Sequence, residues 1–235
     1  MSKISPSVDQ ADNAASISQV SRRKFLGYAG ITTGLAGVLL GTSSCNKDDD
    51  NNNKVYDVTL PAGDFGILNY AYALEQLEAA FYTQVIATPY AGITDNEKSL
   101  LTDIRDHEIA HREFFKAALG TNAIKGLEVN FAAVNFGSRD SVLATAKAFE
   151  DLGVSAYNGA GKLITNPDYL VLAGKIVSVE ARHAALIRDL ISNGTFADST
   201  VIDANGLDKS RTPSEVFAIA GAYIKTSIDI SKLPS

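Results

Sequence analysis

Two of the three histidines in this 235-residue chain occur in the same short motif, Glu-x-x-His. The two copies are Glu108-x-x-His111 and Glu180-x-x-His183. A three-residue interval places both side chains of each copy on one face of a helix. Carboxylate and imidazole groups in this combination suit ions such as iron or manganese. The motifs therefore indicate metal-binding chemistry that combines the scarce histidines with carboxylates.

The two motifs belong to an internal repeat. Glu75 is followed seven residues later by Tyr82 and then by the first motif, and Glu150 is followed seven residues later by Tyr157 and then by the second. The interval from this glutamate to the motif glutamate is 33 residues in one half and 30 in the other. Because histidine is rare in the chain, two histidines at equivalent positions are hard to attribute to chance.

Four helices are needed to position these residues, and the apolar spacing between residues 61 and 191 is helical. The expected bounds are about 65–87, 94–120, 139–165 and 166–191. The start signals are Asp64 as an N-cap, Thr94-Asp95-Asn96-Glu97 as a capping box, Ser138 as an N-cap, and Asn166-Pro167 as a cap followed by proline.

Each helix carries one apolar face that is interrupted near its midpoint by Glu or by Glu-x-x-His. The four faces are Leu68, Ala71, Glu75, Glu78 and Tyr82; Ile104, Glu108, His111, Phe115 and Ala118; Leu143, Ala146, Glu150, Val154 and Tyr157; and Ala173, Ile176, Glu180, His183 and Ile187. Ionised carboxylates are too costly to bury without partners. Four that converge at one level of a bundle therefore require cations among them.

The connections between these helices are short, long and short, and the long one covers about residues 121–137. Seventeen extended residues reach about 56 Å, which exceeds the roughly 37 Å length of a 25-residue helix. This order is consistent with two antiparallel hairpins joined by one long crossover. We expect an all-α four-helix bundle over residues 61–191, followed by a C-terminal extension, 192–235, with a short helix at 213–225.

Three segments of the chain resemble the ferritin-like superfamily: Ala73–Tyr82, Asp106–His111 and Glu180–His183. The resemblance is strongest to its secreted ferritin-like family, which includes plant desiccation-related proteins, and it covers roughly residues 61–191. It implies two iron or manganese ions held by Glu75, Glu108, His111, Glu150, Glu180 and His183.

The same resemblance suggests a role for each residue. Glu108 and Glu180 would bridge the two ions, whereas the other four ligands would each bind one ion. Tyr82 and Tyr157 would lie beside the metals, as core aromatic residues or as redox-active groups. Glu78 is a further candidate that could replace Glu75, add a ligand or form a surface pair.

The implied activity is oxidation of Fe(II) coupled to reduction of O2 or peroxide, as in a ferroxidase, a peroxidase or a catalase-like oxidoreductase. One alternative is a metal-free structural or stress-related surface protein. Another is a zinc metalloprotease, because His107-Glu108-x-x-His111 matches the HExxH motif, in which both histidines bind zinc. The repeat opposes this alternative, since Val179 stands in the second half where His107 stands in the first. His107 is then expected to lie on the helix surface or to donate a hydrogen bond to a metal-ligating residue.

The first 44 residues are expected to be a removed export signal. Ser21–Leu26 contains twin arginines and resembles the twin-arginine signal, and the apolar run that follows, 27–41, is shorter than the roughly 20 residues that span a bilayer. Cys45, the only cysteine, lies where a lipobox places the lipidated residue, although Thr42 replaces the usual leucine. Residues 45–60 then form an acidic tether from a membrane in the periplasm or at the cell surface.

The charge of the chain limits its partners. The net charge is -6 for the whole sequence and becomes -8 over the remaining 191 residues, because residues 1–44 carry four basic and two acidic side chains. Nucleic-acid binding needs a basic face and is not expected. A single cysteine excludes an internal disulfide framework. The expected partners are O2 or peroxide and the membrane, and the sequence leaves a homo-oligomer open.

Overall fold

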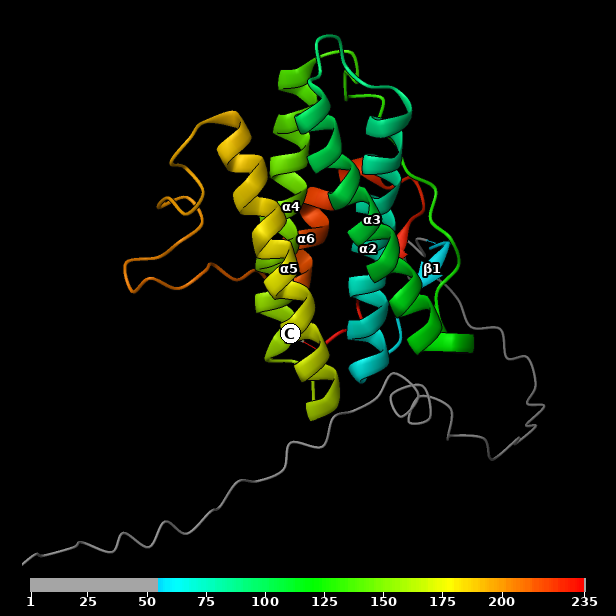
Figure 1. Cartoon of the computed structure of the whole chain (residues 1–235). Helices are drawn as coiled ribbons and strands as arrows, with labels where there is room; N and C mark the ends of the chain where they lie inside the picture. The colour runs from blue at the N-terminus through cyan, green and yellow to red at the C-terminus, as the bar shows by residue number, and fades with distance from the viewer. Residues whose placement is uncertain (1–54, 235) are drawn as a thin grey trace, which may run out of the picture.

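The computed structural model describes residues 55–234, so the expected export signal and Cys45 lie outside the described residues. Figure 1 shows a helical bundle with a small strand pair at one side. The elements are β1 (Val58–Thr59), α2 (Gly63–Ala87), α3 (Asp95–Leu119), a 3-10 turn (Gly120–Asn122), α4 (Arg139–Gly161), α5 (Pro167–Ile191), α6 (Pro213–Ala220), a second 3-10 turn (Gly221–Tyr223) and β2 (Ile228–Asp229). Within residues 55–234, every helix lacks the length or the apolar character that crossing a bilayer requires.

Helices α2 to α5 form two packed hairpins. Helix α2 packs along α3, α4 packs along α5, and the two pairs meet where α2 contacts α4. Residues 120–138 run the length of the bundle from the end of α3 to the start of α4 (Figure 1). The expected all-α, ferritin-like four-helix bundle with one long crossover is therefore confirmed.

The starts of three helices are capped as the sequence predicts. Side-chain oxygens of Thr94, Ser138 and Asn166 each accept a hydrogen bond from a backbone nitrogen in the first turn of the following helix. The capping box at the start of α3 is only half formed. The carboxylate of Glu97 binds Arg139 of α4, at 2.9 Å from its Nε, and so joins the two hairpins.

Two expectations about helix ends were wrong, and Asp64 takes part in both. The N-cap of α2 is Ala62, which places Asp64 inside the first turn. The Asp64 carboxylate accepts hydrogen bonds from the backbone nitrogens of Thr165 and Asn166, each at 2.8 Å. Helix α4 ends at Gly161 instead of continuing to residue 165, because the backbone nitrogens of Leu163 and Ile164 bond to carbonyl oxygens three residues earlier and that of Thr165 bonds to Asp64. Asp64 therefore ties the start of α2 to the start of α5.

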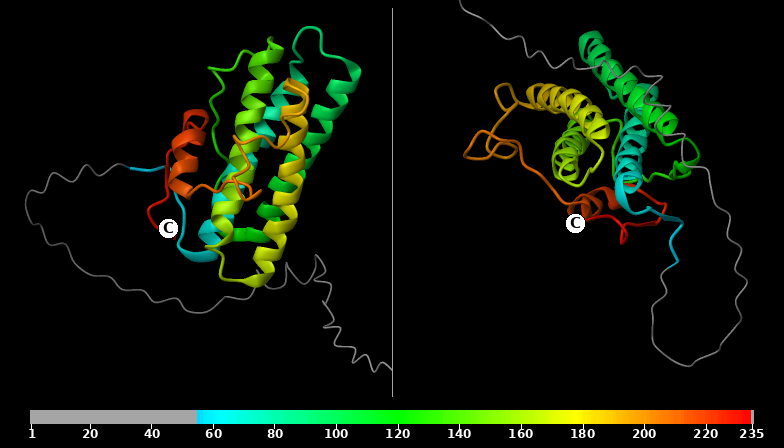
Figure 2. Two further views of the ribbon diagram at one scale, coloured as in Figure 1. Left: turned by 90° about the vertical axis from the view of Figure 1, so that its left-hand side faces the viewer. Right: turned by 90° about the horizontal axis from the view of Figure 1, so that it is seen from below.

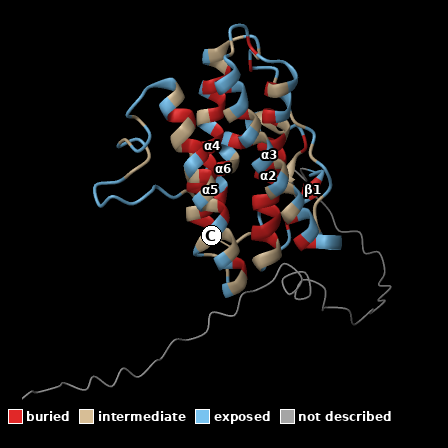
Figure 3. Cartoon of the chain, in the orientation of Figure 1, coloured by how far each residue is buried: buried red, intermediate tan, exposed pale blue. Residues whose placement is uncertain are grey.

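The apolar core lies on the faces of the helices that turn toward one another (Figure 3). One part fills the end of the bundle near the α2–α3 connection and includes Phe81, Val85, Leu101, Ile104, Leu143, Ala146 and Phe149. The other part fills the opposite end and includes Leu68, Ala71, Phe115, Ala118, Tyr157, Tyr169 and Ile176. The midpoint of the bundle therefore has apolar layers on both sides.

The C-terminal extension packs against the bundle. Helix α6 lies against α4, and Phe217 meets Tyr70 edge-on with ring centroids 5.7 Å apart. In the 3-10 turn that follows, the ring of Tyr223 meets that of Phe149 edge-on, with centroids 4.8 Å apart. The helix expected at 213–225 thus ends at residue 220 and continues as this turn. Strands β1 and β2 pair in parallel, which joins the segment before α2 to the end of the chain (Figure 2).

Residues 192–212 extend from the end of α5 to one side of the bundle and return to it (Figure 1), and they are anchored to the bundle at two points. Arg188 of α5 is buried and donates to both carboxylate oxygens of Asp151 at 2.7 Å and to Asp198 at 3.2 Å. Further along, the backbone nitrogen of Arg211 donates to the carbonyl oxygen of Ser155 at 2.9 Å. These contacts lead the chain from the end of α5 back to α4 before α6 begins.

Gly159 makes the second anchor possible. A Cβ at this position would lie 1.7 Å from the carbonyl oxygen of Arg211, whereas a Cβ at Gly174 of α5 would have no atom within 4 Å. We expect Gly159→Ala to lower the free energy of unfolding and Gly174→Ala to raise it by up to about 1 kcal/mol, since alanine favours a helix. Urea unfolding of both variants measures this. Equal changes in the free energy of unfolding would contradict the close approach of Arg211 to Gly159.

Candidate metal centre

Four glutamates and two histidines meet at the midpoint of the bundle. Every one of the four helices contributes: Glu75 from α2, Glu108 and His111 from α3, Glu150 from α4, and Glu180 and His183 from α5. The four glutamates are 0% exposed. Their spacing along the helices brings them to one level, and the apolar layers on both sides exclude water.

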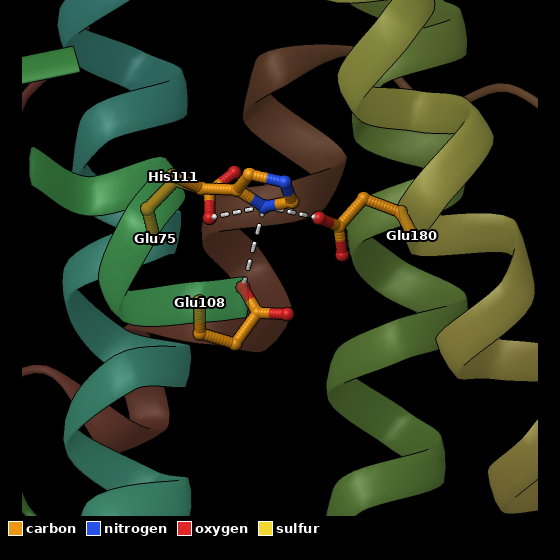
Figure 4. Close-up of side chains that lie close together, drawn as sticks. All are labelled: Glu75, Glu108, His111 and Glu180. Atoms are coloured by element: carbon orange, nitrogen blue, oxygen red, sulfur yellow. Dashed lines mark ion pairs between the residues drawn. The ribbon is translucent and has the colours of Figure 1, made fainter. Parts of the chain in front are cut away.

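The first group of ligand atoms surrounds His111. Its Nδ1 lies 2.9 Å from Glu180 Oε1, 3.4 Å from Glu75 Oε2 and 3.9 Å from Glu108 Oε2 (Figure 4). The four residues each offer one atom, and these atoms lie within 4.8 Å of one another. Figure 4 shows the three carboxylates approaching the imidazole from different helices. This group therefore combines ligands from both hairpins.

The second group surrounds His183 in the same way. Its Nδ1 lies 2.8 Å from Glu108 Oε1, 3.5 Å from Glu150 Oε2 and 3.8 Å from Glu180 Oε2. Glu108 and Glu180 belong to both groups, and each directs one carboxylate oxygen to each histidine. The arrangement has the symmetry of the internal repeat. It allows these two carboxylates to be shared between two ions.

The facing atoms of the cluster make no hydrogen bonds with good geometry, although they are close together. Within residues 55–234 they comprise Nδ1 of both histidines, both oxygens of Glu108 and Glu180, and Oε2 of Glu75 and Glu150. Buried polar atoms without hydrogen bonds are rare in proteins. Eight of them in one cluster indicate a partner other than a protein hydrogen-bonding group, and a cation satisfies both their orientation and their charge.

The charges of the cluster are strongly coupled. Burial lowers the pKa of His111 and of His183, but the adjacent carboxylates outweigh it and raise both pKa values to about 12. Burial raises the pKa of Glu150 to about 7 despite the nearby His183. Burial also raises the pKa of Glu180, but His111 and His183 outweigh it and lower that pKa. Protons or metal ions must therefore neutralise the cluster.

Two tyrosines hold the outer oxygens of two glutamates across the bundle. Tyr82 of α2 donates to Glu150 Oε1 of α4 at 2.6 Å, and Tyr157 of α4 donates to Glu75 Oε1 of α2. Burial raises the pKa of each tyrosine well above its usual value, so both hydroxyls keep their protons. Each tyrosine therefore orients the glutamate of the other half and leaves its Oε2 free to face the cluster.

Glu78 is a seventh acidic group beside the cluster. It is buried, which rules out a surface pair, and it lies outside both groups of candidate ligands. A Cβ at Gly153 would lie 3.2 Å from Glu78 Oε1, so the glycine leaves room for this carboxyl group. Burial and the repulsion of the nearby carboxylates, led by Glu108 and Glu180, raise the pKa of Glu78 well above its usual value. The surroundings of Glu78 therefore favour its protonated form.

His107 does not join the cluster with His111. Its ring lies edge to edge with the ring of His183 and nearly in the same plane, with centroids 5.1 Å apart and an interplanar angle of 10°. Its Nδ1 lies 2.9 Å from Nε2 of His183, on the side of that ring opposite to Nδ1. Burial and the two other histidines lower the pKa of His107. The structure therefore does not place the two histidines of the HExxH motif around one ion.

Sequence analysis missed two contacts that depend on which helices face each other. The helical spacing aligned Tyr82 with Glu75 and Tyr157 with Glu150, yet each tyrosine binds the glutamate of the other half. The available signal was the repeat, since equivalent residues of two halves related by symmetry can pair across the symmetry axis. The contact between His107 and His183 has no equivalent in the repeat, so the sequence left two alternatives for His107, a helix-surface residue or a hydrogen-bonding partner of a ligand, without naming that ligand.

The comparisons agree with this geometry. A family model described as a ferritin-like domain matches residues 63–193, which is more than half of the chain. The chain therefore belongs to the ferritin-like family, with a buried carboxylate and histidine cluster that is compatible with a di-metal site. No curated protein matches the chain significantly.

A matched pair of substitutions tests the tyrosine contacts. Tyr82 and Tyr70 both lie on α2 and are almost completely buried, but the structure gives the Tyr70 hydroxyl no hydrogen-bond partner among the described residues. We expect Tyr82→Phe to lower the free energy of unfolding by about 1–3 kcal/mol, because it leaves a buried carboxylate oxygen without a donor. Tyr70→Phe should be neutral or stabilising. Denaturant unfolding in the presence of a chelator measures the free energy of unfolding of both variants. Equal decreases in the two variants would contradict a stabilising hydrogen bond from Tyr82 to Glu150.

Proposed function

We propose that this protein binds two iron or manganese ions in the cluster and uses them in oxidation chemistry with O2 or peroxide. The observation that carries the proposal is the set of eight buried ligand atoms without hydrogen bonds, arranged around two histidines that share two glutamates. Carboxylate-rich sites with a few imidazoles favour iron and manganese, whereas thiolate ligands favour zinc and copper(I).

The residues divide into shared and separate ligands. Glu108 and Glu180 would bridge the two ions, since each directs one oxygen to each histidine. The remaining ligands of the two positions would be Glu75 with His111 and Glu150 with His183. These four carboxylates would neutralise two divalent cations, which removes the electrostatic cost of burying the acidic groups together.

When bound, the two ions would supply electrons for reduction of dioxygen or hydrogen peroxide. The residues around them prepare this chemistry in three ways. Tyr82 and Tyr157 hold the terminal carboxylates in position through their hydroxyl hydrogens. The apolar layers above and below keep bulk water away. Glu78, whose pKa is raised by burial and by the neighbouring carboxylates, could supply a proton beside the cluster, where reduction of an oxygen species consumes protons.

The zinc protease alternative loses support because His107 contacts His183 instead of sharing an ion with His111.

We also propose that the protein acts outside the cytoplasm as a lipoprotein. The twin-arginine sequence and Cys45 support this, and the tether is short. The ten residues from Cys45 to Val55 reach at most about 36 Å, which would keep the bundle near a membrane surface.

Metal content tests the proposal directly. After anaerobic loading with Fe(II) or Mn(II) and removal of free ions, the purified protein should retain two ions per chain by elemental analysis. Glu108→Gln and Glu180→Gln should each lower this number, because both positions lose a shared ligand. Glu113→Gln is the control, since Glu113 lies on the same helix but is exposed and pairs with Arg112.

Addition of hydrogen peroxide to the Fe(II)-loaded protein should then produce the near-ultraviolet absorbance of Fe(III). Retention of two ions by both glutamine variants would contradict the proposed ligands. Absence of bound metal, with no spectral change, would favour the metal-free structural alternative. One tightly bound zinc ion per chain would favour the protease alternative.

A further inference from the structure

The two halves of the cluster differ at the outer nitrogen of each histidine. Nε2 of His183 lies 2.9 Å from Nδ1 of His107, and the two rings meet edge to edge at an interplanar angle of 10°. Among residues 55–234, the structure records no hydrogen-bond partner for Nε2 of His111. The side chain of His111 is also more exposed than that of His183, at 13% against 5%. The symmetry of the ligand set therefore does not extend to the residues behind it.

The repeat explains why this difference is built into the sequence. His107 directly precedes Glu108, and the residue that directly precedes Glu180 is Val179. By the symmetry of the two halves, Val179 has the place relative to His111 that His107 has relative to His183. A valine side chain has no atom that can accept or donate a hydrogen bond. The first half therefore supplies a polar partner to the second, and the second supplies none in return.

The direction of the hydrogen bond follows from the orientation of the rings. Nδ1 of His183 faces the carboxylates, so metal binding at this atom requires its lone pair and places the ring hydrogen on Nε2. That hydrogen points to Nδ1 of His107, which accepts it. An acceptor at this position fixes the ring orientation and increases the basicity of the ligating nitrogen. His111 lacks this support.

We propose that His107 is a positioning residue that makes the two metal positions unequal, so that the position at His183 binds the first ion more tightly than the position at His111. The inference rests on the proposed function. His107 acts through His183 and does not itself touch the metals. Loss of such a partner typically lowers metal affinity about 10- to 100-fold, and the effect should be confined to one of the two positions.

Two substitutions separate the hydrogen bond from the packing of one ring against the other. His107→Phe keeps a ring against His183 but removes the acceptor, whereas His107→Asn removes the ring but keeps an oxygen near the position of Nδ1. Val179→Ala is the matched control at the equivalent position of the other half. Val179→His is the converse variant, because it offers His111 the partner that it lacks.

The measurement is a titration of the full-length protein with Mn(II), in which free Mn(II) is followed by electron paramagnetic resonance. The wild-type chain should bind two ions in two resolved steps. His107→Phe should weaken the tight step about 10- to 100-fold and leave the weak step unchanged. His107→Asn should retain most of the tight step, Val179→Ala should match the wild type, and Val179→His should strengthen the weak step.

Other outcomes overturn the inference. Two ions bound with equal affinity by the wild-type chain would contradict unequal positions. An unchanged tight step in His107→Phe would show that the hydrogen bond has no effect on the metal, and equal weakening of both steps would show a general structural role. All three results leave the proposed function intact. A wild-type chain that binds no ion would instead overturn the proposed function and this inference together.

Discussion

The burial of four carboxylates at one level of an apolar bundle is the constraint on which the rest of the structure depends. Each helix brings one glutamate to that level, and apolar layers on both sides keep solvent from neutralising the charge. Two histidines and two tyrosines surround the carboxylates but leave eight ligand atoms without hydrogen bonds. Such an arrangement is unfavourable by itself and becomes favourable when cations occupy it.

The cluster also joins the two hairpins, because each group of candidate ligands takes residues from both. Other contacts also join the two hairpins. Asp64 links the start of α2 to the start of α5, Glu97 of α3 binds Arg139 of α4, and each tyrosine reaches the glutamate of the other half. All four helices therefore contribute both ligands and contacts that hold the two hairpins together.

The sequence was sufficient to predict the bundle and the six residues that meet at its centre, because intervals of three and four residues determine which side chains share a helix face. The sequence was not sufficient to predict which side chains of different helices touch. Asp64 was expected to cap its own helix but binds residues 165 and 166, and Glu97 was expected to complete a capping box but binds Arg139. The tyrosine pairs and the contact of His107 with His183 likewise require knowledge of which helices face each other.

We propose that this cluster is a site for two metal ions with shared glutamates. A crystal structure of the full chain grown with Mn(II), with anomalous diffraction data that locate manganese, tests this proposal most directly. We expect two anomalous peaks per chain between Glu108 and Glu180, one beside Nδ1 of His111 and the other beside Nδ1 of His183. No peak at this level of the bundle, or a single peak bound by His107 and His111, would contradict it.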